Sequence, residues 1–526
     1  MATRRAETER PRPARGSVLL IVLVAVAVMS LSAGVYVTGM QNELRASRNG
    51  GRALQARMLA DSAAAYATGL LSLSDDDLFD LGGVYDNPDQ FQRILVVDNA
   101  DPQLQGRFSL VARDAQTGLL RFGLQNESAK LNVNALLAGD DEQQTAARKR
   151  LSAIPGINDE IADAILDWID PDNNARNLGA EESYYAGLQP PYEPRNGPIA
   201  SLDELLAVRG VTPELLYGLD TNRNLRVDLG ESPRGVLAEY DTSTGLYNRG
   251  VADYLTVHSL NTPSPPAGGT FTDLNGDNLQ QIYNKLATVM DEAEAKFIIA
   301  YRQGSTMPAE DRSTAQEARA FNVDFNKKPT RAIDSLLDLV GVKVQITADG
   351  PSGSRSGGGG RGGGGPPTMV QSPWQDEAAV YRDRLPRVLE AFSLGEPVAK
   401  AGLVDVNQAA RSVLLSVDGI DSQTADQIVS RREPVVEPSD YRQRPLWLLA
   451  DGIVDLETMK RIEPFLAVGG DVYSTQAVGY FGAGRPVCRL QLVIDRNKGA
   501  AAVVERSDLT ALGPGFSALD LGEAAE

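Results

Sequence analysis

The feature that most constrains this chain is an uncharged apolar run near its start. Residues 18–37 read VLLIVLVAVAVMSLSAGVYV. A run of about 20 apolar residues is long enough to cross the hydrocarbon core of a bilayer as a helix. Residues 1–16 carry five arginines against two glutamates, and basic flanks favour the cytoplasmic side. We therefore expect one membrane pass, with the bulk of the chain outside the cytoplasm.

Three alternatives remain open for this segment: a cleaved signal peptide, a plain signal anchor, and a leader of the type IV prepilin class. A signal peptide has a shorter apolar core of about 7–15 residues. A prepilin leader is cut after a glycine that precedes the apolar run, and Gly16-Ser17 occupies that place. Apolar residues continue at helical spacing beyond the run, so residues 17–72 are expected to form a membrane and spine helix.

Charge and residue counts exclude several classes of function. The formal net charge is −19, which argues against a nucleic-acid partner. Cys488 and His258 are the single cysteine and histidine. An intrachain disulfide, a thiolate metal cluster and most histidine-dependent mechanisms therefore lack their residues. No nucleophile paired with a base is evident, and we expect no enzyme activity.

Strand-like sequence occurs at both ends of the region after the spine. Residues 107–124 have strand composition around the turn residues 114–118, and residues 471–496 read as a second hairpin. Mostly helical sequence lies between them. The expected fold class is α+β, in which a pilin-like α/β domain is interrupted by a large helical insert and the two strand regions meet in one sheet.

The insert contains a weak internal repeat. Its three copies enter with Leu131–Asn134, Asp273–Asn275 and Val404–Asn407, and each continues with helical sequence and a short hairpin. Two copies hold helix-hairpin-helix (SAM-like) patterns, IPGINDEIADAI and VDGIDSQTADQI. Asn158 and Asp421 replace the second turn glycine there, and acidic neighbours would repel a phosphate. These hairpins are expected to pack against protein.

Residues 220–231 have the spacing of a calcium-binding loop. Calcium takes six to eight oxygen ligands, and an EF-type loop places them at positions 1, 3, 5, 7, 9 and 12. In this chain those positions are Asp220, Asn222, Asn224, the Arg226 carbonyl, Asp228 and Glu231. Leu225 stands where a glycine is usual, so the turn is expected to be distorted and the affinity weak, with a Kd on the order of 10⁻⁴ M.

A second acidic group lies near the end of a predicted helix. Asp167, Asp170 and Asp172 cluster there, with Glu181 further along. This group is a further candidate for calcium, whereas Asp273, Asn275 and Asp277 are more typical of a turn.

The chain resembles the minor pseudopilin K family of type II secretion systems, also called general secretion pathway protein K. The resemblance rests on AILDWIDPD, GAEESYY, SLDELLAVRGV, VDVNQAARSVLLSVDGIDSQTADQIV and DVYSTQAVGYF. Most prepilins have glutamate as the fifth mature residue. Here that residue is Ile21, and the K component is the pseudopilin that lacks this glutamate. The family pattern does not cover residues 260–345.

The resemblance implies a bacterial inner-membrane protein with a cytoplasmic N-terminus and a periplasmic bulk. It implies a role at the tip of the periplasmic pseudopilus, where the protein would start or cap assembly. The implied partners are the I and J minor pseudopilins, the major pseudopilin, prepilin peptidase and the inner-membrane secretion platform. The leader would be cut between Gly16 and Ser17 and the new terminus methylated, and Ca²⁺ would serve as a structural cofactor.

The chain is accordingly expected to divide into eight segments. They are the leader (1–16), the spine (17–72), the first β part (73–130), the first repeat with the calcium-type loop (131–259), the extra middle repeat (260–345), a Gly-rich disordered linker (346–376), the third repeat (377–468), and the second β part with its tail (469–526).

Three other functions are alternatives. The sequence lacks the features that the first two require, and it does not exclude the third. A membrane-anchored DNA-uptake protein would need basic hairpin turns. A surface-anchored hydrolase would need a catalytic constellation. A type IV pilus tip subunit would share the same fold.

Overall fold

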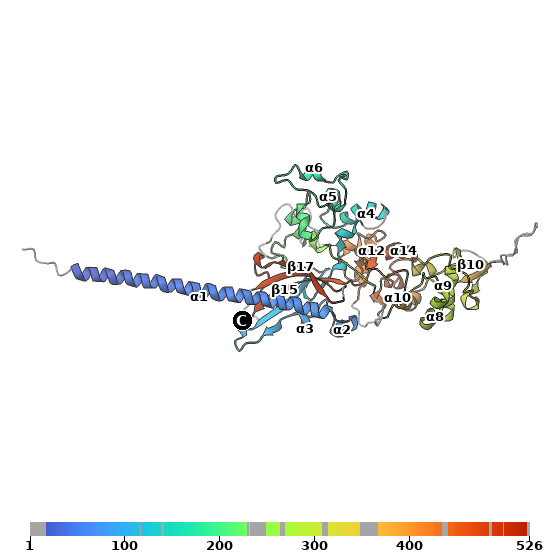
Figure 1. Cartoon of the computed structure of the whole chain (residues 1–526), viewed down its shortest axis with the longest axis horizontal. Coiled ribbons are helices and arrows are strands. Elements are labelled where there is room, and N and C mark those ends of the chain that lie inside the picture. Colours follow the sequence, from blue (N-terminus) through green and yellow to red (C-terminus); the bar gives the residue numbers. More distant parts are fainter. Residues whose placement is uncertain are drawn as a thin grey trace, which may run out of the picture.

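The computed structural model describes residues 17–522. The gaps within that range are 116, 138–140, 229–230, 232–248, 264–268, 308–313, 348–366, 434–439, 483–486 and 498. An elongated helix forms one end of the molecule, and the folded part extends away from its far half (Figure 1).

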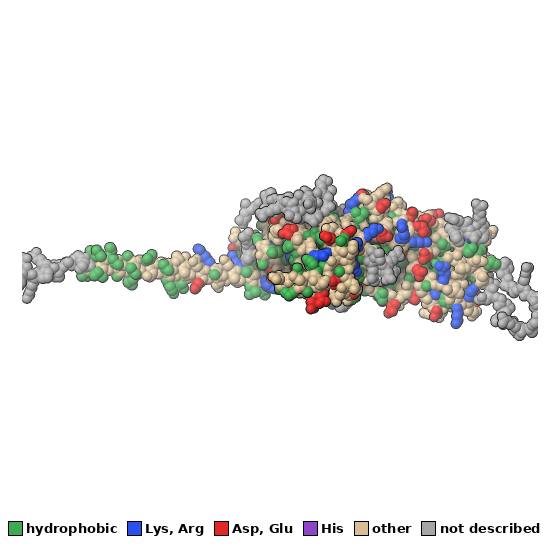
Figure 2. All heavy atoms as spheres, turned by 90° about the horizontal axis from the view of Figure 1, so that it is seen from above, with side chains coloured by type: hydrophobic (Ala, Val, Ile, Leu, Met, Phe, Trp, Pro, Cys, Tyr) green, Lys and Arg blue, Asp and Glu red, His purple; other side chains and the backbone are tan. Residues whose placement is uncertain are grey.

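Helix α1, Ser17–Leu71, has 55 residues and is about 80 Å long at 1.5 Å per residue. Its most apolar 18-residue window has a mean hydropathy of 2.8 and is not buried by any other part of the molecule. Apolar side chains cover the exposed first half (Figure 2). Among the described residues, this is the one helix long and apolar enough to cross a membrane, as the sequence predicts.

The second half of α1 packs on a β-sheet through small residues. Ala56, Ala60, Ala63 and Ala67 are fully buried, and their short side chains let the helix approach the sheet closely. Where the helix contacts strand β15, the strand has a glycine, Gly479. A Cβ atom at this position would lie 2.2 Å from the carbonyl oxygen of Ala56. The helix backbone leaves no room for a side chain at this position.

The sheet joins the two ends of the folded region. Its strand order is β1-β2-β15-β16-β17, with β3 paired to β2 and β4 paired to β15. The strands are β1 Ile94–Val97, β2 Gly106–Arg113, β3 Leu120–Phe122, β4 Gln125–Asn126, β15 Val472–Phe481, β16 Cys488–Asp495 and β17 Ala502–Asp508. Strands β2 and β15 run antiparallel as neighbours. Both predicted hairpins and their meeting in one sheet are confirmed.

Three units follow one another in the insert, and each is closed by a short parallel strand pair. The pairs are β5 Leu131–Asn132 with β6 Leu255–Thr256, β7 Thr272–Asp273 with β12 Phe392–Ser393, and β13 Val404–Asp405 with β14 Leu466–Ala467. The repeat seen in the sequence is therefore structural, and the middle copy has the same closure as the other two.

An asparagine holds each unit together from the same position. Asn134 donates to the carbonyl of Ile199 and accepts from its N–H, at 3.0 and 2.9 Å. Asn275 makes the same pair of bonds with Ile333, at 3.0 and 2.8 Å. Asn407 donates to a carbonyl and accepts from a tryptophan ring. The sequence pattern that defines each entry thus has one physical role.

The helices of the insert are short. They are α4 Asp141–Ser152, α5 Asp159–Ile169, α6 Glu182–Tyr185 and α7 Pro213–Tyr217 in the first unit, α8 Leu279–Val289, α9 Glu292–Gln303 and α10 Leu385–Ala391 in the second, and α11 Arg411–Leu414, α12 Ser422–Arg431, α13 Trp447–Ala450 and α14 Leu456–Ile462 in the third. Helices α2 Asp75–Asp80 and α3 Pro88–Phe91 precede the sheet.

The boundaries predicted around the Gly-rich segment are wrong. Strand β10, Lys343–Ile346, pairs antiparallel with β11, Thr368–Gln371, so residues 346–376 do not separate two repeats. This range includes the last residue of β10 and all of β11, which are adjacent strands of one sheet, ordered β8-β10-β11-β9, with β8 Ser305–Met307 and β9 Gln316–Glu317. The middle unit continues to β12, because glycine-rich composition does not reveal that its flanks pair. Residues 348–366 lie outside the described residues.

Candidate metal centre

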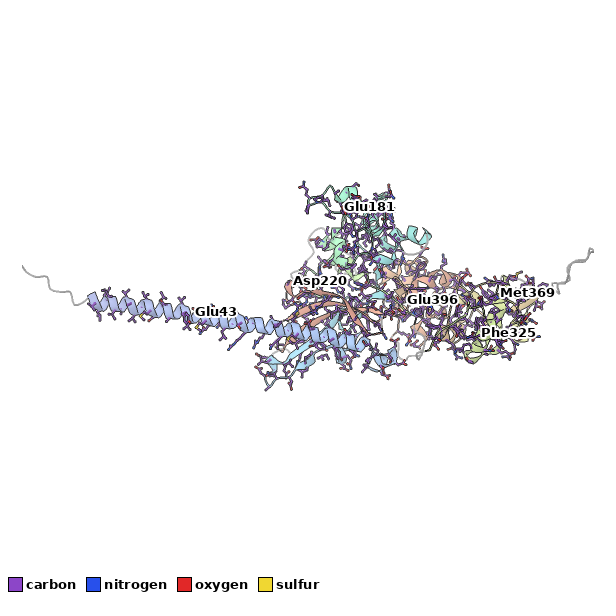
Figure 3. All side chains as sticks on the ribbon, viewed as in Figure 1. Glu43, Glu181, Asp220, Phe325, Met369 and Glu396 are labelled. Carbon is purple, nitrogen blue, oxygen red and sulfur yellow. The ribbon has the colours of Figure 1, made fainter. Side chains whose placement is uncertain are left out.

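Three buried carboxylates meet between the end of α5 and the start of α6. Asp167 and Asp170 stand in the last turn and at the C-cap of α5, and Glu181 precedes the first residue of α6. One ligand oxygen from each lies within 4.8 Å of the other two. All three residues are at most 5% exposed. Figure 3 marks Glu181 on the first unit, away from the sheet.

Glu181 is the unusual member of this cluster. Both of its carboxylate oxygens are buried and have no hydrogen-bond partner. Burial raises its pKa to about 7, and the charges of Asp167 and Asp170 contribute to that rise. A buried carboxylate without partners costs free energy, and a cation bound beside it would remove that cost. The donor set therefore fits a hard divalent cation such as Ca²⁺.

Arg176 supplies part of the positive charge. It donates to Asp167 at 2.6 Å and also contacts Asp170. Burial raises the pKa of Asp167 although the Arg176 contacts act in the opposite direction. One guanidinium faces three carboxylates, so the cluster keeps an excess of negative charge.

The sequence around the cluster explains its shape. Gly179 passes so close to Asp167 that a Cβ atom would lie 1.8 Å from the carboxylate oxygen. The aromatic part of GAEESYY anchors the other side, because the Tyr185 ring packs edge-on against Trp168 with centroids 5.1 Å apart. The string therefore combines a close approach, a carboxylate and an aromatic anchor.

Asp172 does not join the cluster. It is exposed, and its carboxylate accepts from the N–H of Asn174 at 2.7 Å. Glu181 takes the third place instead. The sequence grouped Glu181 with this cluster as a more distant carboxylate, while the ligands named from it were Asp167, Asp170 and Asp172, because spacing alone does not give the fold of the intervening turn.

The described residues of loop 220–231, which are 220–228 and 231, form a turn around Asp220. Asp220 accepts from the N–H groups of Asn224 and Leu225, at 2.8 and 2.7 Å. Leu225 adopts φ +68°, the left-handed conformation that a glycine would take without strain. Leucine therefore forms the turn at its sixth position, at a conformational cost.

Four polar residues of the loop, Asn222, Asn224, Asp228 and Glu231, also bond to one another. Asp228 accepts from the amides of Asn222 and Asn224, at 2.9 and 2.8 Å. Glu231 accepts from the N–H of Asn222 and from that of Asp228. Among the described residues, the three-carboxylate group of Asp167, Asp170 and Glu181 alone meets the 4.8 Å spacing, so the acidic side chains of this loop are less tightly gathered.

The loop also ties the insert to the sheet. Arg226 forms an ion pair with Asp520 of the C-terminal segment. Arg113 on β2 contacts Asp220 at 2.9 Å. The buried Arg489 on β16 donates to the carbonyl of Asn222 at 3.0 Å. Burial raises the pKa of Asp220 to about 6, and Arg113 opposes that effect.

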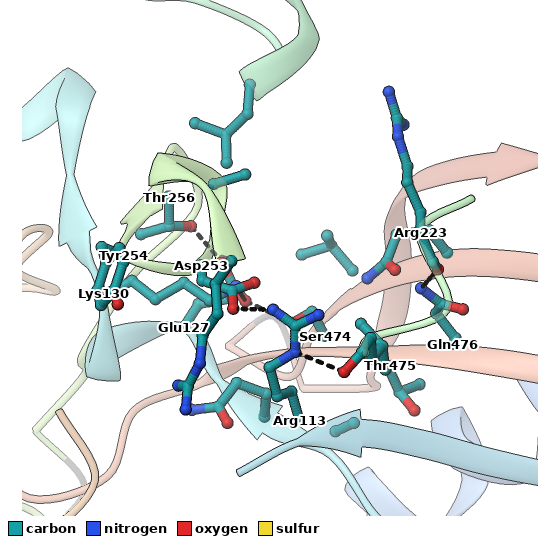
Figure 4. Close-up of a pocket in the computed structure, with 18 of the residues that line it drawn as sticks. Arg113, Glu127, Lys130, Arg223, Asp253, Tyr254, Thr256, Ser474, Thr475 and Gln476 are labelled. Carbon is teal, nitrogen blue, oxygen red and sulfur yellow. Dashed lines mark hydrogen bonds and ion pairs between the residues drawn. The ribbon is translucent and has the colours of Figure 1, made fainter. Parts of the chain in front are cut away.

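A cavity of about 210 Å³ lies between the insert and the sheet (Figure 4). Its wall includes the buried Glu127, which accepts from Lys130 at 2.7 Å, from Ser474 at 2.5 Å, and from Thr256. Burial alone would raise the pKa of Glu127, but these donors outweigh it and lower the pKa. Through Glu127 these contacts link β15 of the sheet to β6 of the insert, and they line the cavity with polar groups.

Two other predicted features are the cleavage site at Gly16-Ser17 and the turn at Asp273. Gly16 and the side chain of Ser17 lie outside the described residues. Asp273 accepts from the N–H of Asn275 at 2.8 Å and from that of Gly395 at 2.8 Å, as expected of a turn residue.

Comparisons with known proteins agree on one family. Residues 129–221 match the family model described as type II secretion system, protein K. Type II secretion system protein K of Aeromonas hydrophila is 35% identical over 212 residues, which are 38% of this chain and 60% of that protein. A putative type II secretion system protein K of Escherichia coli K12 is 29% identical over 215 residues, which are 39% of this chain and 60% of that protein.

A solved structure, the GspK-GspI-GspJ complex of enterotoxigenic Escherichia coli, aligns with a TM-score of 0.37 and 14% identity. The alignment covers 88% of this chain and 98% of that chain. A score of this size supports no conclusion about fold.

The matched region contains the first unit only up to residue 221, and this part includes the carboxylate cluster. The chain spans 60% of the length of the first two relatives. The resemblance found in the sequence is therefore confirmed, and this chain is a relative of type II secretion system protein K.

Proposed function

We propose that the chain is the K-type minor pseudopilin of a type II secretion system. It is anchored in the bacterial inner membrane by the first half of α1, with a cytoplasmic N-terminus and a periplasmic bulk. It starts or caps the pseudopilus at its tip and aids export of folded proteins. Its work is mechanical, and it is not an enzyme.

The observation that carries this proposal is the division of α1 into two halves. The first half exposes apolar side chains along its whole surface, whereas the second is buried against the sheet through alanines. A membrane segment continuous with a head-bound segment holds a folded head at a fixed distance from the bilayer. Together with the family match over residues 129–221, this favours a filament subunit over a free periplasmic protein.

The proposed partners are the I and J minor pseudopilins, the major pseudopilin, prepilin peptidase and the inner-membrane platform. In enterotoxigenic Escherichia coli, GspK forms a complex with GspI and GspJ, which correspond to the first two of these partners. The helix pairs α4–α5 and α11–α12 are proposed to be helix-hairpin-helix modules that pack against protein. Their turns carry Asn158 and Asp421 as N-caps, which accept from the N–H groups of Ile161 and Thr424.

A structural Ca²⁺ is proposed as the cofactor of the first unit. Asp167, Asp170 and Glu181 would hold it, and the unpartnered oxygens of Glu181 support this placement. A second ion is proposed for the loop through Asp220, Asn222, Asn224, the Arg226 carbonyl, Asp228 and Glu231. The cation would supply charge neutralisation that fixes the fold of the insert.

Terminal sequencing of the protein isolated from membranes tests the proposal. A mature chain that starts at Ser17 with a methylated amine is expected, together with crosslinks from α1 to other pilin-like helices. An intact Met1, or a cut beyond Val37, would refute the pseudopilin proposal. Crosslinks to type IV pilus subunits alone would assign the chain to a pilus tip, and retention of DNA at physiological salt would favour DNA uptake.

A further inference from the structure

The middle unit contains a polar cleft that the proposed function does not use. It has a volume of about 770 Å³, within the size range of ligand sites. Strand β8, the end of α9, the end of β10 and the segment 326–331 form its walls. The lining side chains with hydrogen-bonding or charged groups include Gln303, Thr306, Lys327, Lys328, Arg331 and Gln345.

The charge of this cleft opposes that of the chain. Its described lining holds three cations, Lys327, Lys328 and Arg331, and no aspartate or glutamate, although the chain carries a net charge of −19. Lys327 donates to the Thr347 carbonyl at 2.9 Å, and Arg331 donates to the Thr306 hydroxyl at 2.9 Å. Both cations are held by neutral oxygens, so their charge is not neutralised by these contacts.

The walls of the cleft are fixed by buried side chains. Gln303 donates to the carbonyls of Asp324 and Lys327, at 2.7 and 2.9 Å. Arg302 donates to the Arg331 carbonyl at 2.6 Å, and the Arg331 guanidinium lies 4.3 Å from the centroid of the Tyr301 ring. Lys327 and Arg331 are therefore positioned before any ligand arrives, whereas Lys328 is exposed at the rim.

Strand β8 gives the cleft a docking edge for a peptide. Among the strands of the described residues it is the outermost of its sheet, and it pairs with β10 on one side. An edge strand presents main-chain N–H and C=O groups to a further strand. Gln345 adds an amide group to the lining, which matches a peptide group rather than a compact anion.

The cleft lies at the far end of the molecule from the membrane helix. Figure 3 places Phe325, which precedes the lining segment, and Met369 of β11 at the end opposite the start of α1. Lys and Arg side chains are visible at this end of the molecule in Figure 2. With α1 along the membrane normal, this end lies furthest from the membrane.

We propose that this cleft binds an acidic, extended polypeptide segment of a partner protein. The segment lies along β8, and its carboxylates face Lys327, Lys328 and Arg331. This assignment stands apart from the secretion role and from the calcium sites, because it uses only the middle unit.

Binding of labelled octapeptides to the detergent-solubilised full chain tests the proposal. The probes are alternating glutamate–threonine and glutamine–threonine peptides, measured by fluorescence anisotropy at 50 mM salt. The glutamate peptide is expected to bind at least tenfold more tightly, although the net charge of the chain repels it. Equal binding of the two peptides would overturn the proposal.

Lys328→Glu is the main variant, because Lys328 is exposed and the substitution does not disturb packing. It is expected to lower the affinity for the glutamate peptide about tenfold. Lys327→Gln is expected to lower this affinity less. Lys285→Glu changes an exposed position of α8 outside the lining. The affinity of this variant for the glutamate peptide should be within twofold of the wild-type affinity. An unchanged affinity in Lys328→Glu would overturn the assignment of the cleft. Displacement of the peptide by equimolar citrate or phosphate would show a simple anion site and overturn the peptide assignment.

Discussion

Glu181→Gln gives the sharpest test of the carboxylate cluster. In the folded chain without a cation, burial and neighbouring charges raise the pKa of Glu181 from 4.5 to about 7. A carboxylate whose folded pKa is raised binds its proton more tightly in the folded state. Stability therefore falls as the pH rises from about 4.5 to about 7, and this loss is complete above the folded pKa.

The size of the effect follows from the same pKa. At pH 8 the ionised Glu181 costs at most about 3 kcal/mol, which corresponds to roughly a hundredfold change in a local opening constant. Asp167 has a raised pKa as well and acts in the same direction. A bound cation would remove both penalties, so its stabilisation should be larger at pH 8 than at pH 5.

Hydrogen exchange of the α5 amides in the full chain measures this directly. In chelator, wild-type protection, corrected for intrinsic rates, should fall by up to about a hundredfold between pH 5 and pH 8, and millimolar Ca²⁺ should restore it. Glu181→Gln should flatten the pH dependence and lose most of the calcium response. The exposed neighbour Glu182 supplies the matched control, because Glu182→Gln should behave as wild type. Wild-type protection that does not change with pH, or a full calcium response in Glu181→Gln, would refute the reasoning.

Three further perturbations probe the fold. Gly479→Ala should destabilise the head by about 1–3 kcal/mol in a denaturant melt, because the added Cβ meets the backbone at Ala56. Gly69 has open space around it, so Gly69→Ala should leave the stability unchanged or raise it. Equal effects of the two substitutions would contradict this packing. Arg489→Leu should release the C-terminal segment to proteolysis, because it leaves buried carbonyl groups of loop 220–231 and that segment without their donor; resistance equal to wild type would contradict it. Burial raises the pKa of the Cys488 thiol, so a disulfide reagent should label it slowly at pH 8 and rapidly in denaturant, and fast native labelling would count against that burial.

Sequence periodicity predicted the parts of the fold that depend on local pattern. The apolar run, the two hairpins and the three asparagine entries are each visible within a few tens of residues. The meeting of the two strand regions in one sheet was also predictable, because two isolated strand regions need partners. The antiparallel pairing of β2 with β15 is a finding of the structure. The short parallel closures of the units were not predicted, because each joins two-residue strands far apart in the sequence.

The candidate site shows the same limit. Asp167 and Asp170 share the end of one helix, so their proximity follows from helical spacing. Glu181 reaches them through a turn that depends on Gly179, and no periodicity encodes that approach. The Gly-rich segment was misread for a related reason, since composition indicates flexibility but not which strands lie on either side.

The pairing of β2 with β15 has a consequence for how the chain becomes functional. Thr475 bonds to Val111 across 364 positions of sequence, and contacts of such separation form late and slowly. The apolar face of α1 and the open side of β2 are therefore covered only after β15, β16 and β17 have been synthesised and have joined the sheet. A chain truncated within the insert would leave both surfaces exposed. The head can therefore complete its fold only when the C-terminal strands are present.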